Sequence, residues 1–207
     1  MATYADLKSR VARELGRRDL ESDIDAACKA GIRLYRGRRF RFNELTATMN
    51  TIAGQAWYGV SSGLPAGIQE VDSITVDQWG QQTALCQRAY SELEALDTAQ
   101  SMRSAPDFWC WYGERLRLWP VPDRVYPLAL SCVATIPAPA SDDAENAWTG
   151  DAEALIRAFA VRTLARDVIR DPEKEAAGER AEIEALRTLD REAAAYQSTG
   201  RLAGSGW

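Results

Sequence analysis

The stretch from Asp107 to Pro122, with the sequence DFWCWYGERLRLWPVP, most limits how this chain can fold. It holds three of the seven tryptophans, and apolar and polar residues alternate from Arg115 to Trp119, as in a strand with one covered face. Gly113 lies where two aromatic strands can reverse direction, and Pro120 and Pro122 prevent the ladder from continuing. The stretch therefore predicts an antiparallel hairpin.

Such a hairpin has two interpretations: the floor of a small β-sheet, or a surface on which a ligand stacks. We favour the structural role, because aromatic residues at strand spacing usually form a core. The residues assigned to this structural hairpin are Trp109, Trp111, Leu116, Leu118, Trp119, Pro120 and Pro122.

Helical signals begin at the N-terminus. Thr3 is a plausible N-cap with Asp6 at the N3 position, and Gly16 is a natural stop for the first helix. Ser22 or Asp23 is expected to cap a second helix, which ends near position 37. This pair has two interpretations, a helix-turn-helix that binds DNA or an ordinary helical pair with a solvated basic end, and we favour the second. The basic group consists of Arg33, Arg36, Arg38, Arg39 and Arg41.

Between the helical ends, the periodicity becomes that of strands. Residues 45–52 and 55–60 are predicted to form one antiparallel pair, residues 68–77 and 128–136 two further strands, and residues 88–99 a helix. We expect four to six strands in all, with one short helix. After this region, Asp151 can cap a helix that stops before Pro172, and a second helix runs to about Tyr196. Its predicted apolar face contains Ile183, Leu186, Leu189, Ala193 and Tyr196.

The predicted fold class is therefore α+β: a helical bundle from N- and C-terminal helices, with an inserted antiparallel β-rich region. The predicted organisation is N-terminal helices in 1–39, a β-rich insertion in 40–136, a linker in 137–150, C-terminal helices in 151–196 and a flexible tail in 197–207.

Composition narrows the function. The chain contains no histidine, so it cannot build a Ser-His-Asp or Cys-His nucleophile, and no phosphate-binding glycine motif is present. We expect no enzyme, no cofactor, no metal and no catalytic residue. The four cysteines are widely spaced, and we expect them to be buried free thiols. Nothing in the sequence predicts membrane insertion or secretion, which indicates synthesis in the cytoplasm.

Charge is unevenly distributed. Residues 1–41 carry eleven Lys and Arg against six Asp and Glu, a balance of +5, which leaves −10 for the remainder. This asymmetry suggests either a surface for nucleic acid or complementary faces on neighbouring subunits.

The order of these features resembles the head-to-tail adaptor proteins of tailed bacteriophages and gene transfer agents. The resemblance rests on two N-terminal helices, the FNELT motif at Phe42–Thr46, a strand ending at Gly80, the hairpin with its LWPVP segment at Leu118–Pro122, and two alanine-rich C-terminal helices. It implies a structural virion protein of the neck, forming a ring, usually of twelve copies, beneath the portal. The tail or a tail-completion protein would attach below, and DNA would pass through the lumen without sequence-specific binding.

In that family the C-terminal segment commonly reaches the portal, which implies a portal-binding role for Arg201, Leu202 and Trp207. We further expect the basic group at 33–41 to act in subunit or portal contacts. Two alternatives remain: a small DNA-binding regulator that uses the N-terminal helix pair, and a carboxylate-dependent enzyme with paired acids in a pocket.

Overall fold

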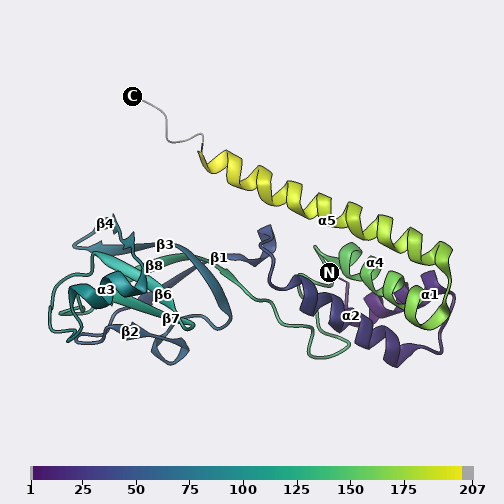
Figure 1. Cartoon of the computed structure of the whole chain (residues 1–207), viewed down its shortest axis with the longest axis horizontal. Coiled ribbons are helices and arrows are strands. Elements are labelled where there is room, and N and C mark those ends of the chain that lie inside the picture. Colours follow the sequence, from purple (N-terminus) through teal and green to yellow (C-terminus); the bar gives the residue numbers. More distant parts are fainter. Residues whose placement is uncertain (1, 202–207) are drawn as a thin grey trace. The chain divides into compact units, whose positions relative to one another are not determined.

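The structure is a computed structural model that describes the backbone of residues 2–201 and the side chains of residues 2–195. Its fold class is α+β, as predicted from the sequence. The chain divides into two compact units, which we call the helical unit (residues 1–42 and 136–207) and the β unit (residues 43–135). Figure 1 labels most of the helices and strands of both units.

The helical unit surrounds one apolar core, to which α1, α2, α4 and α5 all contribute. The short helix η1 (Arg41–Asn43) leads out of this unit. The bounds are α1 Tyr4–Leu15, α2 Glu21–Tyr35, α4 Glu153–Leu164, a π-helical turn η3 at Ala165–Ile169, and α5 Pro172–Arg201.

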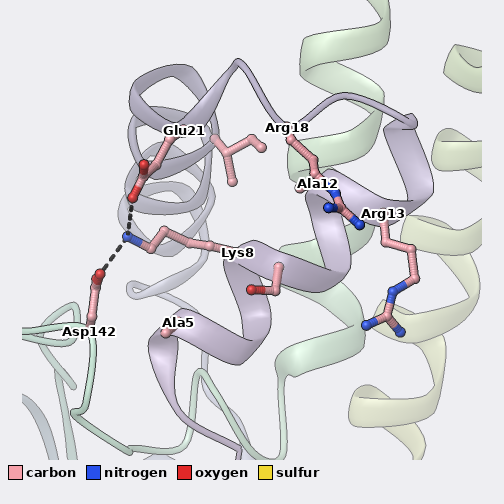
Figure 2. A pocket seen from close by; sticks show the side chains of 9 residues that line it. Ala5, Lys8, Ala12, Arg13, Arg18, Glu21 and Asp142 are labelled. Carbon is pink, nitrogen blue, oxygen red and sulfur yellow. Dashed lines mark ion pairs between the residues drawn. The ribbon is translucent and has the colours of Figure 1, made fainter.

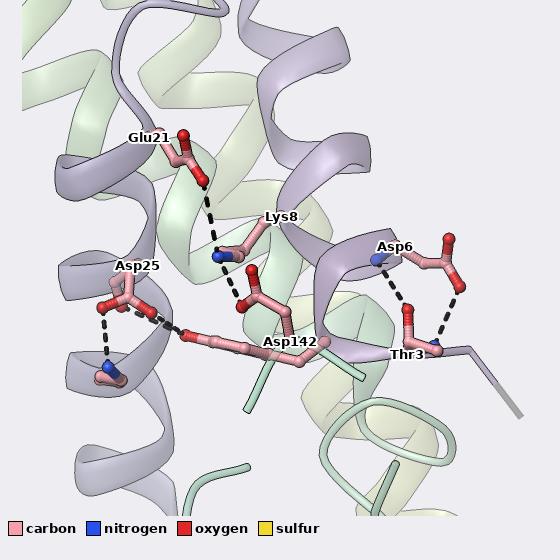
Figure 3. Close-up of polar contacts among 8 residues, drawn as sticks. Thr3, Asp6, Lys8, Glu21, Asp25 and Asp142 are labelled. Carbon is pink, nitrogen blue, oxygen red and sulfur yellow. Dashed lines mark hydrogen bonds and ion pairs between the residues drawn. The ribbon is translucent and has the colours of Figure 1, made fainter. Parts of the chain in front are cut away.

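The predicted start and end of α1 are confirmed. The backbone N–H of Asp6 donates to the Thr3 hydroxyl over 3.2 Å, and the backbone N–H of Thr3 donates to the Asp6 carboxylate over 3.0 Å (Figure 3). This reciprocal capping box satisfies two N–H groups that the helix leaves unpaired. Gly16 ends the helix with φ of 70°, a left-handed conformation that glycine adopts without strain.

The predicted cap of α2 is wrong. The N-cap is Leu20, without a side-chain hydrogen bond, so Ser22 and Asp23 lie inside the first turn. Tertiary packing outweighs the local capping preference here, because Leu20 is buried in the core. Further along α2, Gly31 packs so closely on Phe159 that an added Cβ would lie 2.8 Å from its ring.

Helix α5 runs to Arg201, beyond the predicted end near residue 196. Among the α5 side chains that the structure describes, which exclude Tyr196, the buried positions are Gly178, Glu182 and Leu189, and these follow helical spacing. The predicted apolar face is wrong at Ile183, which is 43% exposed, because the neighbouring Glu182 occupies the buried position.

Residues 137–150 have no helix or strand, but they pack as part of the helical unit. Trp148 is fully buried, and its indole N–H donates to the carbonyl of Ile136 over 2.9 Å. Phe40 and Phe42 meet the Trp148 ring edge-on, with centroids 6.3 and 5.4 Å away. The proline-rich composition that predicted a linker therefore describes a segment held by a buried aromatic cluster.

The β unit contains two four-stranded sheets, ordered β1-β8-β3-β4 and β2-β7-β6-β5. All neighbouring strands are antiparallel except the β5–β6 pair. The bounds are β1 Glu44–Asn50, β2 Trp57–Tyr58, β3 Ile68–Gln78, β4 Gln81–Ala84, β5 Cys86–Gln87, β6 Phe108–Tyr112, β7 Arg115–Trp119 and β8 Pro127–Ala134, with a 3-10 turn η2 at Val60–Ser62 and a short helix α3 at Tyr90–Leu96.

One apolar cluster fills the space between the two sheets. Met49, Val76 and Leu130 contribute from the first sheet, and Trp109 and Leu118 from the second. The more buried positions alternate with exposed ones along most of β1, and β8 is buried or partly buried after Pro127, as expected for strands that pack one face against a second sheet.

Two predictions for this unit are wrong. Residues 45–52 and 55–60 do not pair with each other: β1 pairs with β8, and β2 pairs with β7 of the other sheet. There are eight strands rather than four to six, because β2, β4 and β5 are only two to four residues long. Such short strands depend on their neighbours and leave little periodicity in the sequence.

Candidate functional site

The charge asymmetry of the sequence is balanced inside the helical unit. Residues 1–42 carry +5 and residues 136–207 carry −5, so this unit is formally neutral, and the β unit carries the whole net charge of −5. Ion pairs between described residues join the two segments, among them Lys8–Asp142 at 2.8 Å, Arg38–Asp190 at 3.1 Å, Arg10–Glu153 at 3.2 Å and Arg157–Glu14 at 3.6 Å. Complementary charges on a neighbouring subunit are therefore not needed to balance the basic N-terminus.

The structure brings the basic group at 33–41 together at the C-terminal end of α2 and the turn after it. Arg33, Arg36, Arg38 and Arg41 are exposed, and Arg39 is partly buried. The Arg38 guanidinium donates to both carboxylate oxygens of Asp190 on α5, over 3.1 and 3.2 Å. Arg38 is thus engaged within the chain, and the group remains a candidate surface for carboxylates or phosphates.

A surface cavity of about 440 Å³ lies between α1, α2 and the segment around Asp142 (Figure 2). Lys8 crosses it from α1: its ammonium group lies 2.8 Å from Asp142 and 4.0 Å from Glu21. Arg13 and Arg18 add two cations to the lining, and Ala5, Ala12 and Ile24 add apolar surface. The hydrogen bond to Asp142 raises the pKa of Lys8, so this amine stays charged and cannot act as a base near neutral pH.

The same segment is held against the start of α1. The backbone N–H groups of Tyr4 and Ala5 donate to the carbonyls of Ala144 and Asp142, over 3.1 and 2.9 Å. The Tyr4 hydroxyl donates to Asp25 on α2 over 3.0 Å. Burial raises the pKa of Tyr4, so this hydroxyl remains a donor. The arrangement fixes the fold locally and offers no nucleophile.

A buried carboxylate that sequence reasoning missed joins three helices. Glu182 on α5 accepts a short hydrogen bond from the Tyr35 hydroxyl on α2 and one of 2.5 Å from Nε of Arg162 on α4. Burial and this hydrogen bond raise the pKa of Tyr35. The available signal was the position of Glu182, four residues after Gly178 and seven before Leu189, which places it on the buried stripe.

In the β unit, the predicted hairpin is formed by β6 and β7, with Gly113 and Glu114 at the turn, both at positive φ. Trp109 is 1% exposed, and its indole N–H donates to the carbonyl of Leu85 over 3.2 Å. Trp111 and Trp119 are partly buried. The remaining members of the set, Leu116, Leu118, Pro120 and Pro122, are buried. These positions favour a structural role over a stacking surface.

Beside the hairpin lies a second buried charge that the sequence did not reveal. Arg117 in β7 is 1% exposed and forms an ion pair with Glu94 of α3. Its guanidinium lies 5.5 Å from the centre of the Trp57 ring and 5.6 Å from that of Tyr90. Tyr90 in turn stacks on Tyr112 at 4.4 Å. The aromatic rings and Glu94 compensate the buried cation in place of water.

The cysteine prediction holds for three of four residues. Cys28, Cys110 and Cys132 are buried free thiols, but Cys86 is exposed, because β5 is a short edge strand. Within the part of the chain that the structure describes, no group of three or more Cys, Asp or Glu residues could hold a metal ion. Of the proposed tail contacts, Leu202, Trp207 and the side chain of Arg201 lie outside the described residues.

Among the helices that the structure describes, none combines the length and apolarity of a membrane span. A search of curated proteins finds no match to this chain. The family model described as SU10 adaptor protein matches residues 2–203, nearly the whole length. The chain therefore belongs to the SU10 adaptor protein family, whose members are structural virion proteins of bacteriophages rather than enzymes.

Proposed function

We propose that this protein is a head-to-tail adaptor that forms a ring, most simply of twelve copies, beneath the portal. The ring would connect the capsid to the tail, or to a tail-completion protein, around the DNA channel. The observation that carries this proposal is the match to an adaptor family over residues 2–203. The two-unit architecture supports it, because a ring subunit needs two different surfaces that face different neighbours.

The charge of the β unit is compatible with a DNA channel. This unit carries −5, and carboxylates gain nothing from contact with phosphates, so a lumen lined by such a surface lets DNA slide. The basic group, which consists of Arg33, Arg36, Arg38, Arg39 and Arg41, is the surface we assign to subunit or portal contacts.

The test is sedimentation of the purified chain with isolated portal rings, followed by negative-stain imaging to count subunits. Portal-bound rings are expected. The paired charge reversal Arg36→Glu with Arg39→Glu should weaken binding at least tenfold, whereas Arg13→Glu, on exposed α1 surface, should not. A chain that neither assembles nor sediments with portal rings would contradict the proposal.

The C-terminal segment has its own test. Deleting residues 198–207 removes Arg201, Leu202 and Trp207, which we propose as portal contacts, because Trp and Arg are frequent anchors of interfaces. The truncated chain should keep its circular dichroism spectrum and lose portal binding. If the truncated chain binds portal rings as well as the full chain does, the C-terminal segment is not part of the interface.

The regulator hypothesis makes a different prediction for the same protein. A DNA-binding regulator would bind duplex DNA at physiological ionic strength, with an affinity that falls steeply as salt rises. The adaptor should show no such specific binding, since its basic N-terminal segment is balanced by acidic partners.

A further inference from the structure

The first sheet of the β unit has two open edges. Its order is β1-β8-β3-β4, so β1 and β4 each have one neighbouring strand, and among the described residues no strand pairs on their outer sides. An edge strand presents unpaired N–H and C=O groups, which form a template for another strand. The edges of the second sheet, β2 and β5, are only two residues long and offer much less.

Neither edge of the first sheet carries the usual protection against pairing. Strand β1, with the sequence ELTATMN, pairs with β8 at seven consecutive positions without a bulge, and its one charge is Glu44 at the start. Strand β4, with the sequence QQTA, has no charge at all. Neither contains proline or lysine, although 27% of the whole chain is charged. Natural proteins normally block exposed edges with such residues or with bulges, so a regular edge whose one charge lies at its first residue, and a second edge with no charge, indicate strands that are covered in the assembly.

The directions of the two edges are complementary. Each neighbouring pair in this sheet is antiparallel, so β1 and β4 run in opposite directions. When a second copy continues the sheet in the same orientation, its β4 lies antiparallel to β1 of the first copy. The contact is heterologous and leaves one β1 edge and one β4 edge open at the ends, which is the requirement for a closed ring.

We propose that β1 of one copy pairs with β4 of the next, so that adjacent subunits share one continuous antiparallel sheet. This inference rests on the ring proposed above and names the surface that forms it. The contact spans up to the four residues of β4. Backbone hydrogen bonds supply its affinity, as in other strand-addition interfaces.

The side-chain faces of the two edges are compatible with this pairing. Met49 of β1 lies on the core face, so Thr46 and Thr48 lie on the opposite face. Gln82 of β4 is the partner of Asp77 in β3, next to the buried Val76, and therefore lies on that same outer face. A shared sheet would place small polar side chains beside one another, without a buried charge.

Proline substitutions in β1 separate this contact from folding. Successive backbone N–H groups of a strand point to opposite edges, so of Thr46→Pro and Ala47→Pro, one removes a hydrogen bond to β8 and the other only an outward N–H. The variant that loses only an outward N–H is identified by urea unfolding, because its midpoint is the same as that of the wild type. That variant should lose ring assembly by light scattering and still fold. If this variant is as stable as the wild type and still assembles into normal rings, the proposal is wrong.

Disulfide trapping tests the same contact without relying on proline. In a Cys86→Ser background, which removes the exposed native thiol, Gln82→Cys is combined with Thr48→Cys or, for a register shifted by two, with Thr46→Cys. Oxidised assemblies should give a ladder of covalent multimers, because each copy carries both halves of the contact. If rings form but neither cysteine pair gives a ladder, the proposal is wrong. It is also wrong if Thr48→Cys alone gives covalent dimers, because such dimers require β1 of one copy to pair with β1 of another. A wild-type chain that forms no ring, with or without portal, would instead contradict the proposed function.

Discussion

The helical unit and the β unit manage their polar groups in opposite ways. In the helical unit, a segment of +5 packs on a segment of −5, and ion pairs such as Lys8–Asp142 and Arg10–Glu153 join them. The β unit carries a net charge of −5, and of its edge strands β1 has one charged residue, Glu44, and β4 has none. The helical unit thus has no net charge, whereas the β unit has edge strands, β1 and β4, whose outer backbone N–H and C=O groups can pair with another strand.

This difference separates stability from assembly. Outside the basic group at 33–41 and the C-terminal segment, substitutions in the helical unit should act mainly on folding, because its ion pairs join residues of the same unit. Substitutions at the edges of the β unit should act mainly on association. Unfolding of the two units can be followed separately, since the β unit holds five of the seven tryptophans and the helical unit most of the helix.

The largest expected effect is Trp109→Ala in the core of the β unit. This side chain is 1% exposed, so its loss should lower the free energy of unfolding by about 3–5 kcal/mol. The matched control is Trp79→Ala at the β3–β4 turn: Trp79 is 83% exposed and contacts Arg124 at 4.0 Å. Tryptophan fluorescence in urea measures both. A change within 0.5 kcal/mol is expected for the control by the usual range of surface substitutions. If both variants lost the same free energy of unfolding, the result would contradict a structural role for the hairpin.

Glu182→Ala gives the corresponding test in the helical unit. It removes the acceptor for Tyr35 and Arg162 and leaves the Arg162 guanidinium partly buried without its partner, which should cost about 3 kcal/mol. Tyr35→Phe removes only one hydrogen bond and should cost about 1 kcal/mol. The control is the exposed Glu179→Ala. If circular dichroism in urea shows Glu182→Ala to be as mild as its control, the network does not stabilise the unit.

Much of this fold was predictable because local chemistry decides it. The capping box of α1 and the turn at Gly113 depend on residues within a few positions of each other, and both form as predicted. The candidate surfaces were less predictable. The basic group at 33–41 was visible in the sequence, but its pairing with Asp190, about 150 residues later, was not.

The remaining errors come from long-range contacts. The pairing of β1 with β8 joins residues 44 and 133, and no pattern within β1 specifies this partner. Glu182 and Arg117 are charged residues that the sequence would place on the surface, and only partners from other elements allow their burial. Open edges such as β4 are also invisible without the strand order.

Alkaline pH should weaken the helical unit through Cys28. Burial raises the pKa of this thiol to about 12, whereas in the unfolded chain it ionises near its ordinary value of about 8.5. The folded state therefore holds a proton that the unfolded state releases. This contribution is fully present below about pH 8.5 and is lost as the pH rises towards 12, by about 3 kcal/mol at pH 11.

The comparison is with Cys28→Ala, which lacks the thiol but keeps Tyr4 and Tyr35, whose pKa values are also raised. Urea unfolding between pH 8 and 11 should show a shallower decline for the variant than for the wild type. Parallel declines would show that the thiol does not contribute.

The smallest expected effect concerns the close approach of α5 to α4. An added Cβ at Gly178 would lie 2.9 Å from the backbone nitrogen of Arg162, so Gly178→Ala must push the two helices apart. Overpacking of this kind costs about 1–3 kcal/mol, against a gain of about 1 kcal/mol from helix propensity. The net loss should therefore be about 1 kcal/mol. Gly37→Ala is the matched control, because nothing lies within 4 Å of its added Cβ, and it should be neutral or slightly stabilising. Circular dichroism in urea measures the free energy of unfolding of both variants. A Gly178→Ala variant that is more stable than the wild type would show that α5 is not held against α4 at this distance.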